Sequence, residues 1–287
     1  MNRTCNLFAV TLFVAVSPTA SAQTAPDEDR PTAVPSKSKD EMLKRFVAEC
    51  VTIKLGTDGF PRKFEVGEAS PGRNELPRKK ATLQHSFQIS KFETTQELYA
   101  AIMGTNPSRW KGPRNSVENV SWKDVQSFCT KLTEELRAKK LLGPKEIVRL
   151  PTAIEWEYCC RAGSKRRYCF GDEVGKGKSA TGTLDEYAWH TGNAAGNDPA
   201  VGVLKANAWG LYDVHGYLWE FVATPDGEGT SADAKVAKAQ RQIRGGSWRD
   251  PHDLLSSATF RMVLDPERND ATGFRCVIAK GEVAVDE

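Results

Sequence analysis

The sequence lacks several features that define large classes of proteins. It contains only four histidines among 287 residues, too few for a histidine-rich metal site. Its 40 basic and 37 acidic residues almost cancel, so it lacks the excess of positive charge that nucleic-acid-binding proteins carry. Beyond the N-terminal region, no apolar run approaches the ~20 residues that a membrane-spanning helix needs. Composition therefore predicts neither a nucleic-acid partner nor a membrane span.

Common catalytic and cofactor motifs are also missing. There is no P-loop, G-x-G-x-x-G, EF-hand loop or G-x-S-x-G nucleophile elbow. No C-x-x-C occurs, so neither a zinc knuckle nor a thioredoxin-type redox site is predicted. Two short basic runs, RKK at 78–80 and KRR at 165–167, are interpreted as solvated loops rather than as binding patches.

The N-terminal region has the features of a secretory signal peptide. Arg3 is followed by an apolar run at 7–16, and Ala20-Ser21-Ala22 provides an A-x-A cleavage site. We therefore expect residues 1–22 to be a signal peptide cleaved near Ala22, and the protein to be exported to the periplasm or secreted. Residues 23–44 are polar and rich in proline, which predicts a flexible linker. One domain at 45–280 and a tail at 281–287 complete the predicted organisation.

Hydrophobic periodicity predicts an α+β fold with short strands, about three helices and much irregular structure. The helices start near Thr94, Ser121 and Thr152, each followed three residues later by an acidic residue that can complete a capping box. Strands are expected at 51–55, 85–89, 241–244 and 274–279. Because helices and strands do not alternate regularly, a doubly wound parallel sheet is excluded.

Six sequence phrases then occur in a fixed order. They are FQISKFETT at 87–95, VSWKD with FC at 120–129, RLPT to CRAG at 149–163, NAWGLYDVHG with LWEF at 207–221, RGGSW at 244–248 and GFRC at 273–276. Together they resemble the formylglycine-generating enzyme family, also called the sulfatase-modifying factor domain. The resemblance covers residues 46–280 and implies that family's variant of the C-type lectin fold.

The same resemblance implies an oxidase whose catalytic residues this chain does not carry. Enzymes of the family convert the cysteine of a C-x-P-x-R segment to formylglycine, using copper held by two cysteines. Those two positions fall here on Asp250 and near Leu255, beside Ser247, and no cysteine occurs between 170 and 275. Copper(I) prefers soft thiolates, whereas a carboxylate is a hard ligand and leucine is not a ligand. We therefore do not expect copper chemistry.

The resemblance also implies cysteine pairing. The family often links the cysteines of its F-C and G-F-R-C phrases, which are Cys129 and Cys276 here, so a disulfide is predicted between them; two separate buried thiols are the alternative. Partners for the remaining cysteines stay open, with a link from Cys159 or Cys160 to Cys169 as one possibility and none assigned to Cys50.

Two calcium sites are implied by the resemblance. The first would use carboxylates of Asp213 and Glu220 and carbonyl groups of Gly216 and Leu218, which are the oxygen ligands that calcium prefers. The alternative is a pair of solvated acids that cap loops. A second site would use Asn193 and Asp198.

Three functions remain in competition. The first is an exported, non-catalytic binding or assembly domain for a protein, peptide or glycan. The second is a formylglycine-generating oxidase, or a related oxygenase with an altered site. The third is a hydrolase that uses Ser247, His252 and either Asp250 or Asp253. Whether any catalysis survives is left open by the sequence.

Overall fold

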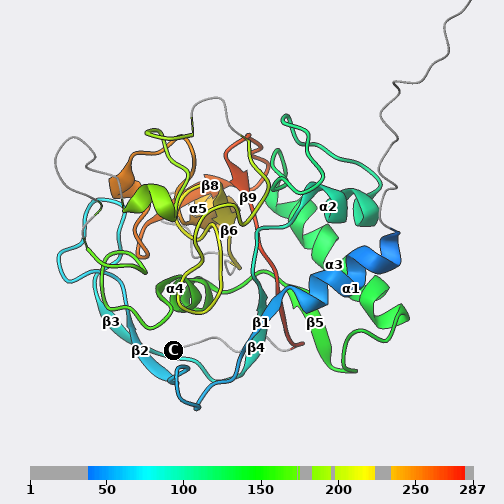
Figure 1. Ribbon diagram of the computed structural model, residues 1–287, viewed down its shortest axis with the longest axis horizontal. Coiled ribbons are helices and arrows are strands. Elements are labelled where there is room, and N and C mark those ends of the chain that lie inside the picture. Colours follow the sequence, from blue (N-terminus) through cyan, green and yellow to red (C-terminus); the bar gives the residue numbers. More distant parts are fainter. Residues whose placement is uncertain (1–37, 173, 175–182, 195–197, 224–233, 282–287) are drawn as a thin grey trace, which may run out of the picture. The chain divides into compact units, whose positions relative to one another are not determined.

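A computed structural model describes residues 38–172, 174, 183–194, 198–223 and 234–281 (Figure 1). The predicted signal peptide, most of the predicted linker and residues 282–287 of the predicted tail lie outside these residues. The α-helices are α1 (Lys39–Ala48), α2 (Gln96–Met103), α3 (Trp122–Ala138), α4 (Ala153–Arg161) and α5 (Ala234–Ala239), with short 3-10 helices η1 (Leu184–Glu186) and η2 (His252–Leu254).

The strands form small sheets, as the predicted α+β class requires. They are β1 (Cys50–Ile53), β2 (Lys63–Val66), β3 (Lys79–Thr82), β4 (Phe87–Ser90), β5 (Glu146–Arg149), β6 (Trp219–Phe221), β7 (Gln240–Arg244), β8 (Phe260–Leu264), β9 (Thr272–Gly273) and β10 (Val277–Lys280). One antiparallel sheet has the order β1-β4-β10-β5, and β2 pairs with β3. A further sheet has the order β8-β7-β6-β9, in which only β6 and β9 are parallel.

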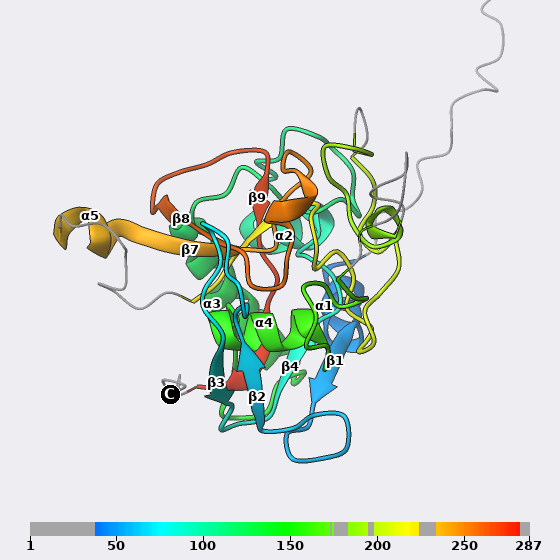
Figure 2. The same cartoon turned by 90° about the vertical axis from the view of Figure 1, so that its left-hand side faces the viewer.

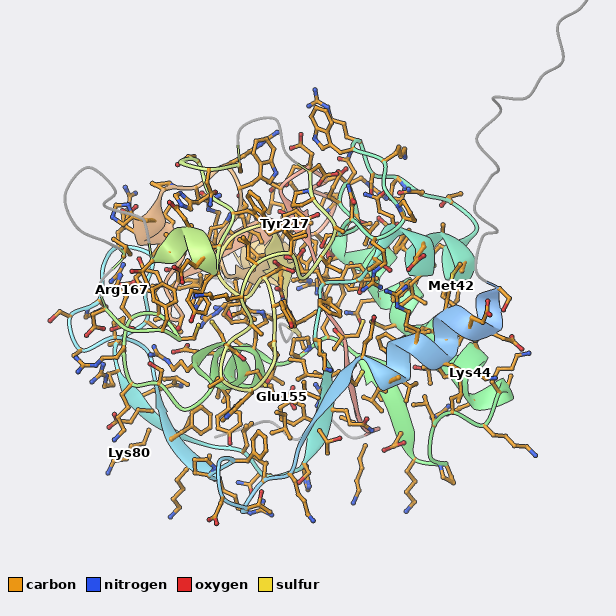
Figure 3. All side chains as sticks on the ribbon, in the orientation of Figure 1. Met42, Lys44, Lys80, Glu155, Arg167 and Tyr217 are labelled. Carbon is orange, nitrogen blue, oxygen red and sulfur yellow. The ribbon has the colours of Figure 1, made fainter. Side chains whose placement is uncertain are left out.

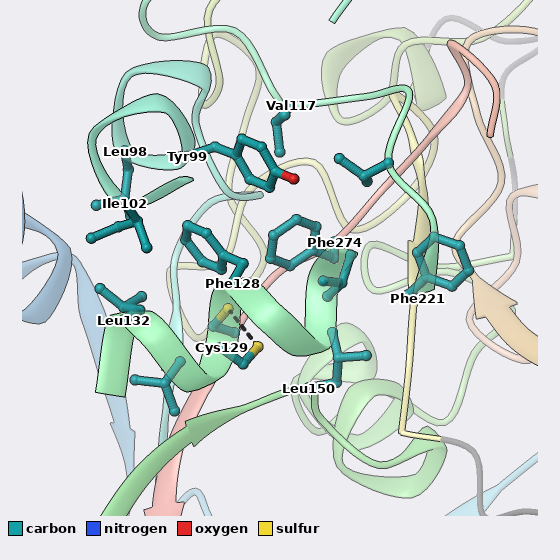
Figure 4. Close-up of a cluster of buried hydrophobic side chains, with 14 of the residues drawn as sticks. Leu98, Tyr99, Ile102, Val117, Phe128, Cys129, Leu132, Leu150, Phe221 and Phe274 are labelled. Carbon is teal, nitrogen blue, oxygen red and sulfur yellow. Dashed lines mark hydrogen bonds between the residues drawn. The ribbon is translucent and has the colours of Figure 1, made fainter. Parts of the chain in front are cut away.

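The main hydrophobic core lies between helices α1 to α3 and the sheet that contains β5 and β10. The rings of Tyr99 and Phe128 stack with centroids 5.3 Å apart, and Phe274 meets Phe128 edge-on at 5.2 Å (Figure 4). Burying each large apolar side chain of this kind stabilises the fold by roughly 1.5–3 kcal/mol. This core fixes α3, which carries Cys129, and the chain just before β10, which carries Cys276.

Helix α1 corrects the predicted start of the domain. The chain folds from Lys39 rather than from 45, because Ser38 and Glu41 form a capping box and Leu43 and Phe46 are buried. The polar composition of residues 23–44 masked this signal, since only one face of the helix is apolar. The helix thus begins inside the predicted linker, whose residues 23–37 lie outside the described part of the chain.

The other helix starts follow local sequence signals to different degrees. The predicted capping boxes of α3, at Ser121 and Asp124, and of α4, at Thr152 and Glu155, are confirmed. Helix α2 forms as predicted but without its capping box, because its first amides donate to Pro113 O and Asn115 O instead.

The remaining elements pack around α4. The β2–β3 pair lies in front of α4 in Figure 2, and α4 contacts both β2 and β7. No helix among the described residues is long and apolar enough to cross a membrane.

Candidate functional site

The loop after β7 begins with a turn of two glycines, both with positive φ. Strand β7 pairs with β6, placing Arg244 opposite Glu220, and the chain then turns through Gly245 and Gly246. Gly246 has a φ of 76°, and a Cβ atom there would lie 2.7 Å from the carbonyl oxygen of Leu254. Only glycine fits this turn without displacement of backbone, and the turn brings Gly246 close to Leu254 and Leu255.

Asp250, which the resemblance predicts at the first catalytic position, accepts hydrogen bonds from several neighbouring residues. Its Oδ2 atom accepts from Trp219 Nε1 at 2.7 Å and from both the hydroxyl and the backbone amide of Ser247, at 2.5 and 3.0 Å. Its Oδ1 atom accepts from Arg261 Nη2 at 3.1 Å. The carboxylate is buried, and every one of these bonds to a charged acceptor stabilises the loop.

Leu255, at the second position, is part of the core. Its side chain is completely buried and clusters with Tyr168, Leu184 and Ala188. It also fills the space left by Gly216, where a Cβ atom would approach Leu255 Cδ2 to 2.9 Å. The two residues expected at the family's catalytic positions, Asp250 and Leu255, therefore both have structural contacts.

The hydrolase hypothesis requires a base beside Ser247. The Ser247 hydroxyl donates to Asp250 and accepts from the amide of Arg249. His252 is exposed on η2, and its carbonyl accepts from Tyr168. A serine whose proton is directed to a carboxylate is not arranged like the serine of a Ser–His pair.

The first expected calcium-ligand set differs from the observed contacts. Both carboxylate oxygens of Glu220 bond Arg275, at 2.6 and 2.7 Å, and Glu220 also accepts from Trp156 Nε1. Gly216 and Leu218 lie on the same segment, and the amide of Leu218 donates to Glu93. Because both carboxylate oxygens of Glu220 accept hydrogen bonds from Arg275, Glu220 does not fit the role of a calcium ligand in this arrangement. Calcium binding remains an untested prediction.

Three buried carboxyl groups, those of Glu93, Asp213 and Glu220, surround the guanidinium of Arg275. The sequence analysis did not predict that Glu93 belongs to this cluster. Asp213 accepts from the amide of Gly202 at 2.8 Å. Burial, reinforced by the nearby charge of Glu220, raises the pKa of Asp213 to about 6. Burial and the same neighbouring carboxylates raise the pKa of Glu93 well above its usual value.

The second expected calcium pair is likewise engaged in protein contacts. Asn193 accepts from the amide of His190 and donates to Ala188 O. Asp198 accepts from Asn115 at 2.6 Å and from the Tyr217 hydroxyl at 3.3 Å. Residues 195–197, between the pair, lie outside the described part of the chain.

Cys129 and Cys276 meet in the main core, with their sulfur atoms 3.9 Å apart (Figure 4). Both side chains are buried and are free thiols in this structure. A disulfide requires about 2.05 Å, so the structure places the two sulfurs as neighbours and leaves the bond a prediction.

The other cysteines gather in part around His215. The Cys160 sulfur lies 3.8 Å from His215 Nε2, and the amide of Cys169 donates to the same nitrogen at 3.1 Å. Burial lowers the pKa of His215 to about 4, which keeps this imidazole neutral and able to accept. Cys159 is buried elsewhere in the core, and Cys50 donates to Phe46 O. Their pairing stays open.

A partly exposed surface lies next to Asp250 and is formed by Arg109, Trp110, Trp248, Arg249 and Asp270; we call it the tryptophan–arginine surface. Each arginine lies over a tryptophan ring, at 4.8 Å for Arg109 and 4.6 Å for Arg249. Both arginines pair with Asp270, and Trp110 is 46% exposed. Sequence reasoning missed this surface because its members come from three distant segments.

The fold and this site together define a class: a mixed α+β domain of the formylglycine-generating enzyme type. Residues 40–280 match the family described as the sulfatase-modifying factor enzyme 1-like domain. The chain belongs to that family, as its six sequence phrases predicted.

Curated relatives include catalytic and non-catalytic proteins. The chain is 27% identical to the chaperone protein LppX of Paenibacillus barcinonensis, over 73% of the chain and 83% of the relative. It is 31% identical to the inactive C-alpha-formylglycine-generating enzyme 2 of Bos taurus, over 58% of the chain and 50% of that protein. A formylglycine-generating enzyme of Mycobacterium tuberculosis is 32% identical over 45% of the chain and 50% of the relative. The chain thus spans about half the length of these last two.

Solved structures agree on the fold. PvdO from Pseudomonas aeruginosa superposes with a TM-score of 0.63 and 25% identity, covering 80% of this chain and 94% of PvdO. Treponema denticola variable protein 1 gives a TM-score of 0.59 at 23% identity, covering 79% and 98%. The predicted fold class is confirmed.

Proposed function

We propose that this protein is an exported, non-catalytic member of its family that acts in binding or assembly. The proposal rests on the contacts of Asp250 and Leu255, the residues expected at the family's two catalytic positions. Asp250 accepts hydrogen bonds from Trp219, Ser247 and Arg261, and Leu255 is a fully buried core side chain. Neither supplies the soft thiolate that copper(I) prefers.

The comparisons support this direction. A relative named as an inactive formylglycine-generating enzyme and another named as a chaperone both match the chain. The signal-peptide features of residues 1–22 support export. The formylglycine-generating oxidase remains the alternative function.

The tryptophan–arginine surface is the proposed contact site for a protein partner. Tryptophan and arginine are the residue types most enriched among the residues that dominate binding energy. Here the guanidinium groups already lie over the rings and pair with Asp270, so their side chains lose little freedom on binding. A peptide segment of the partner would stack on Trp110 and hydrogen-bond to the arginines.

Copper binding tests the non-catalytic part of the proposal. Under oxygen-free conditions, copper(I) is titrated into the wild type and into the Asp250→Cys/Leu255→Cys double variant against a competing chelator. We expect the variant to gain a tightly bound copper ion that the wild type lacks. Tight copper(I) binding by the wild type, equal to that of the variant, would contradict the proposal.

An array of 15-residue peptides from unrelated exported proteins tests the binding part. We expect discrete peptides to bind the wild type, and Trp110→Ala to weaken them about tenfold, since a central aromatic contact contributes more than 1 kcal/mol. Val203→Ala is the matched control, because Val203 is also an exposed apolar side chain and lies outside the surface. Equal loss in both variants, or no binding peptides, would contradict the assignment.

A further inference from the structure

The two basic runs of the sequence, 78–80 and 165–167, lie side by side. Arg78 Nη2 donates to the carbonyl oxygen of Lys165 at 3.4 Å, although 87 positions separate them. The first run leads into β3, and the second follows the end of α4. Lys80 and Arg167 appear on the same side of the molecule in Figure 3. Their interpretation as separate solvated loops is therefore incomplete.

Two adjoining cavities open between these runs. The first, of about 540 Å³, lies between the β2–β3 pair and the end of α4, and its apolar lining includes Phe64, Ala81 and Tyr158. The second, of about 500 Å³, is lined by Arg78, Arg166 and Arg167 together with Glu68 and Asp172. Lys165 lines both cavities, so they adjoin, and we call the two together the double cavity.

The apolar part of the double cavity has a fixed floor. The ring centroid of Tyr158 lies 4.4 Å from that of Phe64 and 4.7 Å from that of Trp209. The Tyr158 hydroxyl donates to Pro61 O at 3.0 Å, which holds the ring in place. A preformed apolar floor favours entry of an aromatic or aliphatic side chain, because little ordering is needed on binding.

The rim carries positive charge that the protein does not neutralise. Lys63, Lys80 and Lys165 are exposed, and no ion pair of their ammonium groups occurs among the described residues. Arg166 pairs with Asp172, but both side chains are at least half exposed, so this ion pair is weak and open to exchange. Seven basic and three acidic residues line the two cavities. The four arginines among them pair with carboxylates, so within the described part of the chain the charge without a partner is that of the three lysines.

The strands beside the cavity favour a peptide over a polysaccharide. Among the described residues, β2 and β3 pair only with each other, so each has one edge without a sheet partner. An extended peptide can add to such an edge through backbone hydrogen bonds, with alternate side chains entering adjacent pockets.

We propose that the double cavity binds an extended acidic peptide segment of a partner protein, with an aromatic or aliphatic side chain in the apolar cavity and carboxylates against Lys80, Lys165 and Arg166. None of its lining residues belongs to the tryptophan–arginine surface, so this inference does not depend on that surface.

Fluorescence anisotropy with a labelled twelve-residue peptide of glutamate, aspartate and two phenylalanines tests the proposal. We expect binding to the full-length mature protein, and at least about tenfold weaker binding to Lys80→Glu/Lys165→Glu, which corresponds to about 1.4 kcal/mol. Binding should also weaken as sodium chloride is raised, since exposed charges are screened. The matched control is Lys54→Glu/Lys79→Glu, which changes the net charge equally. Neither Lys54 nor Lys79 is among the residues that line the two cavities.

Three results would overturn the proposal. If the control variant bound the peptide as weakly as the test variant, the attraction would depend only on net charge. A peptide with serines in place of phenylalanines would bind equally if the apolar cavity were unused. A sulfated oligosaccharide of the same charge would bind more tightly than the peptide if the true ligand were a glycan.

Discussion

The loop after β7 and the surface beside β3 use their charged side chains in opposite ways. In the loop, Asp250 is buried, and both of its oxygens accept hydrogen bonds from the protein. Beside β3, Lys80 and Lys165 are exposed around a cavity. The difference indicates that Asp250 is bound into the structure of its loop, whereas charge without a partner lies at the surface. Substitutions should therefore affect stability in the first region and recognition in the second.

The largest loss of stability is expected on substitution of Glu220, a buried residue of β6. Glu220→Ala leaves Arg275 buried without its carboxylate, so the free energy of unfolding should fall by about 3–5 kcal/mol. Urea denaturation measures it. Glu186→Ala removes an exposed pair with Lys205 and is the control, with an expected loss of about 0–1 kcal/mol. Similar losses in both variants would show that burial does not set the difference.

A comparable effect is expected from the predicted Cys129–Cys276 link. If it forms, its reduction should lower the free energy of unfolding by about 2–5 kcal/mol, because a long loop is released. Peptide mass mapping before and after reduction detects the link, and the Cys129→Ser/Cys276→Ser variant should be insensitive to reductant. An unchanged peptide map would reject the link.

Asp250→Ala tests the loop itself. We expect the free energy of unfolding to fall by about 2–4 kcal/mol, because the buried Trp219 indole and the amide of Ser247 lose their acceptor. Asp253→Ala, three positions away and exposed, should change it by less than about 0.5 kcal/mol. Chemical denaturation of both variants measures this difference. An Asp250→Ala protein as stable as the wild type would contradict the structural role assigned to Asp250.

Local and distant signals explain what the sequence could predict. The capping boxes at Ser121 and Thr152 were predictable because each lies within four residues. Ser38 and Glu41 offered the same signal for α1, but in a segment whose polar composition suggested a linker.

The candidate site divides along the same line. The position of Asp250 followed from counting along one phrase, whereas its bond to Trp219 joins residues 31 positions apart. The two basic runs were visible in the sequence, but their contact across 87 positions depends on the tertiary fold. No local pattern contains that information.

A smaller, pH-dependent effect is expected at Asp213. Its pKa is raised from 3.8 to about 6 in the folded protein, so the folded state favours the protonated form. The stabilisation is complete below pH 3.8 and is lost as the pH rises through 6. Asp213→Asn should therefore be more stable than the wild type by about 1–3 kcal/mol at pH 7–8, and equal to it near pH 3.5.

Thermal unfolding across this pH range, with and without a calcium chelator, measures the effect. A variant that is less stable than the wild type at pH 7, together with a wild type that chelator destabilises, would instead support the expected calcium site. In that case the Asp213 charge would be required for a bound cation.

The smallest effect on stability is expected on the open surface. Arg166→Ala removes an ion pair whose side chains are 70% and 50% exposed, so the free energy of unfolding should change by about 0–1 kcal/mol. Urea denaturation is again the measurement. A loss as large as that of Asp250→Ala would show that the basic runs stabilise the fold, and the contrast between the two regions would disappear.

The most direct test of the central claim is turnover of a C-x-P-x-R peptide by the wild type. The peptide is incubated with the protein, copper and oxygen, and mass spectrometry follows conversion of the cysteine thiol to an aldehyde. Because Asp250 and Leu255 provide no thiolate, we predict that the peptide mass stays unchanged. Catalytic formation of the aldehyde would contradict the structural role assigned to both residues.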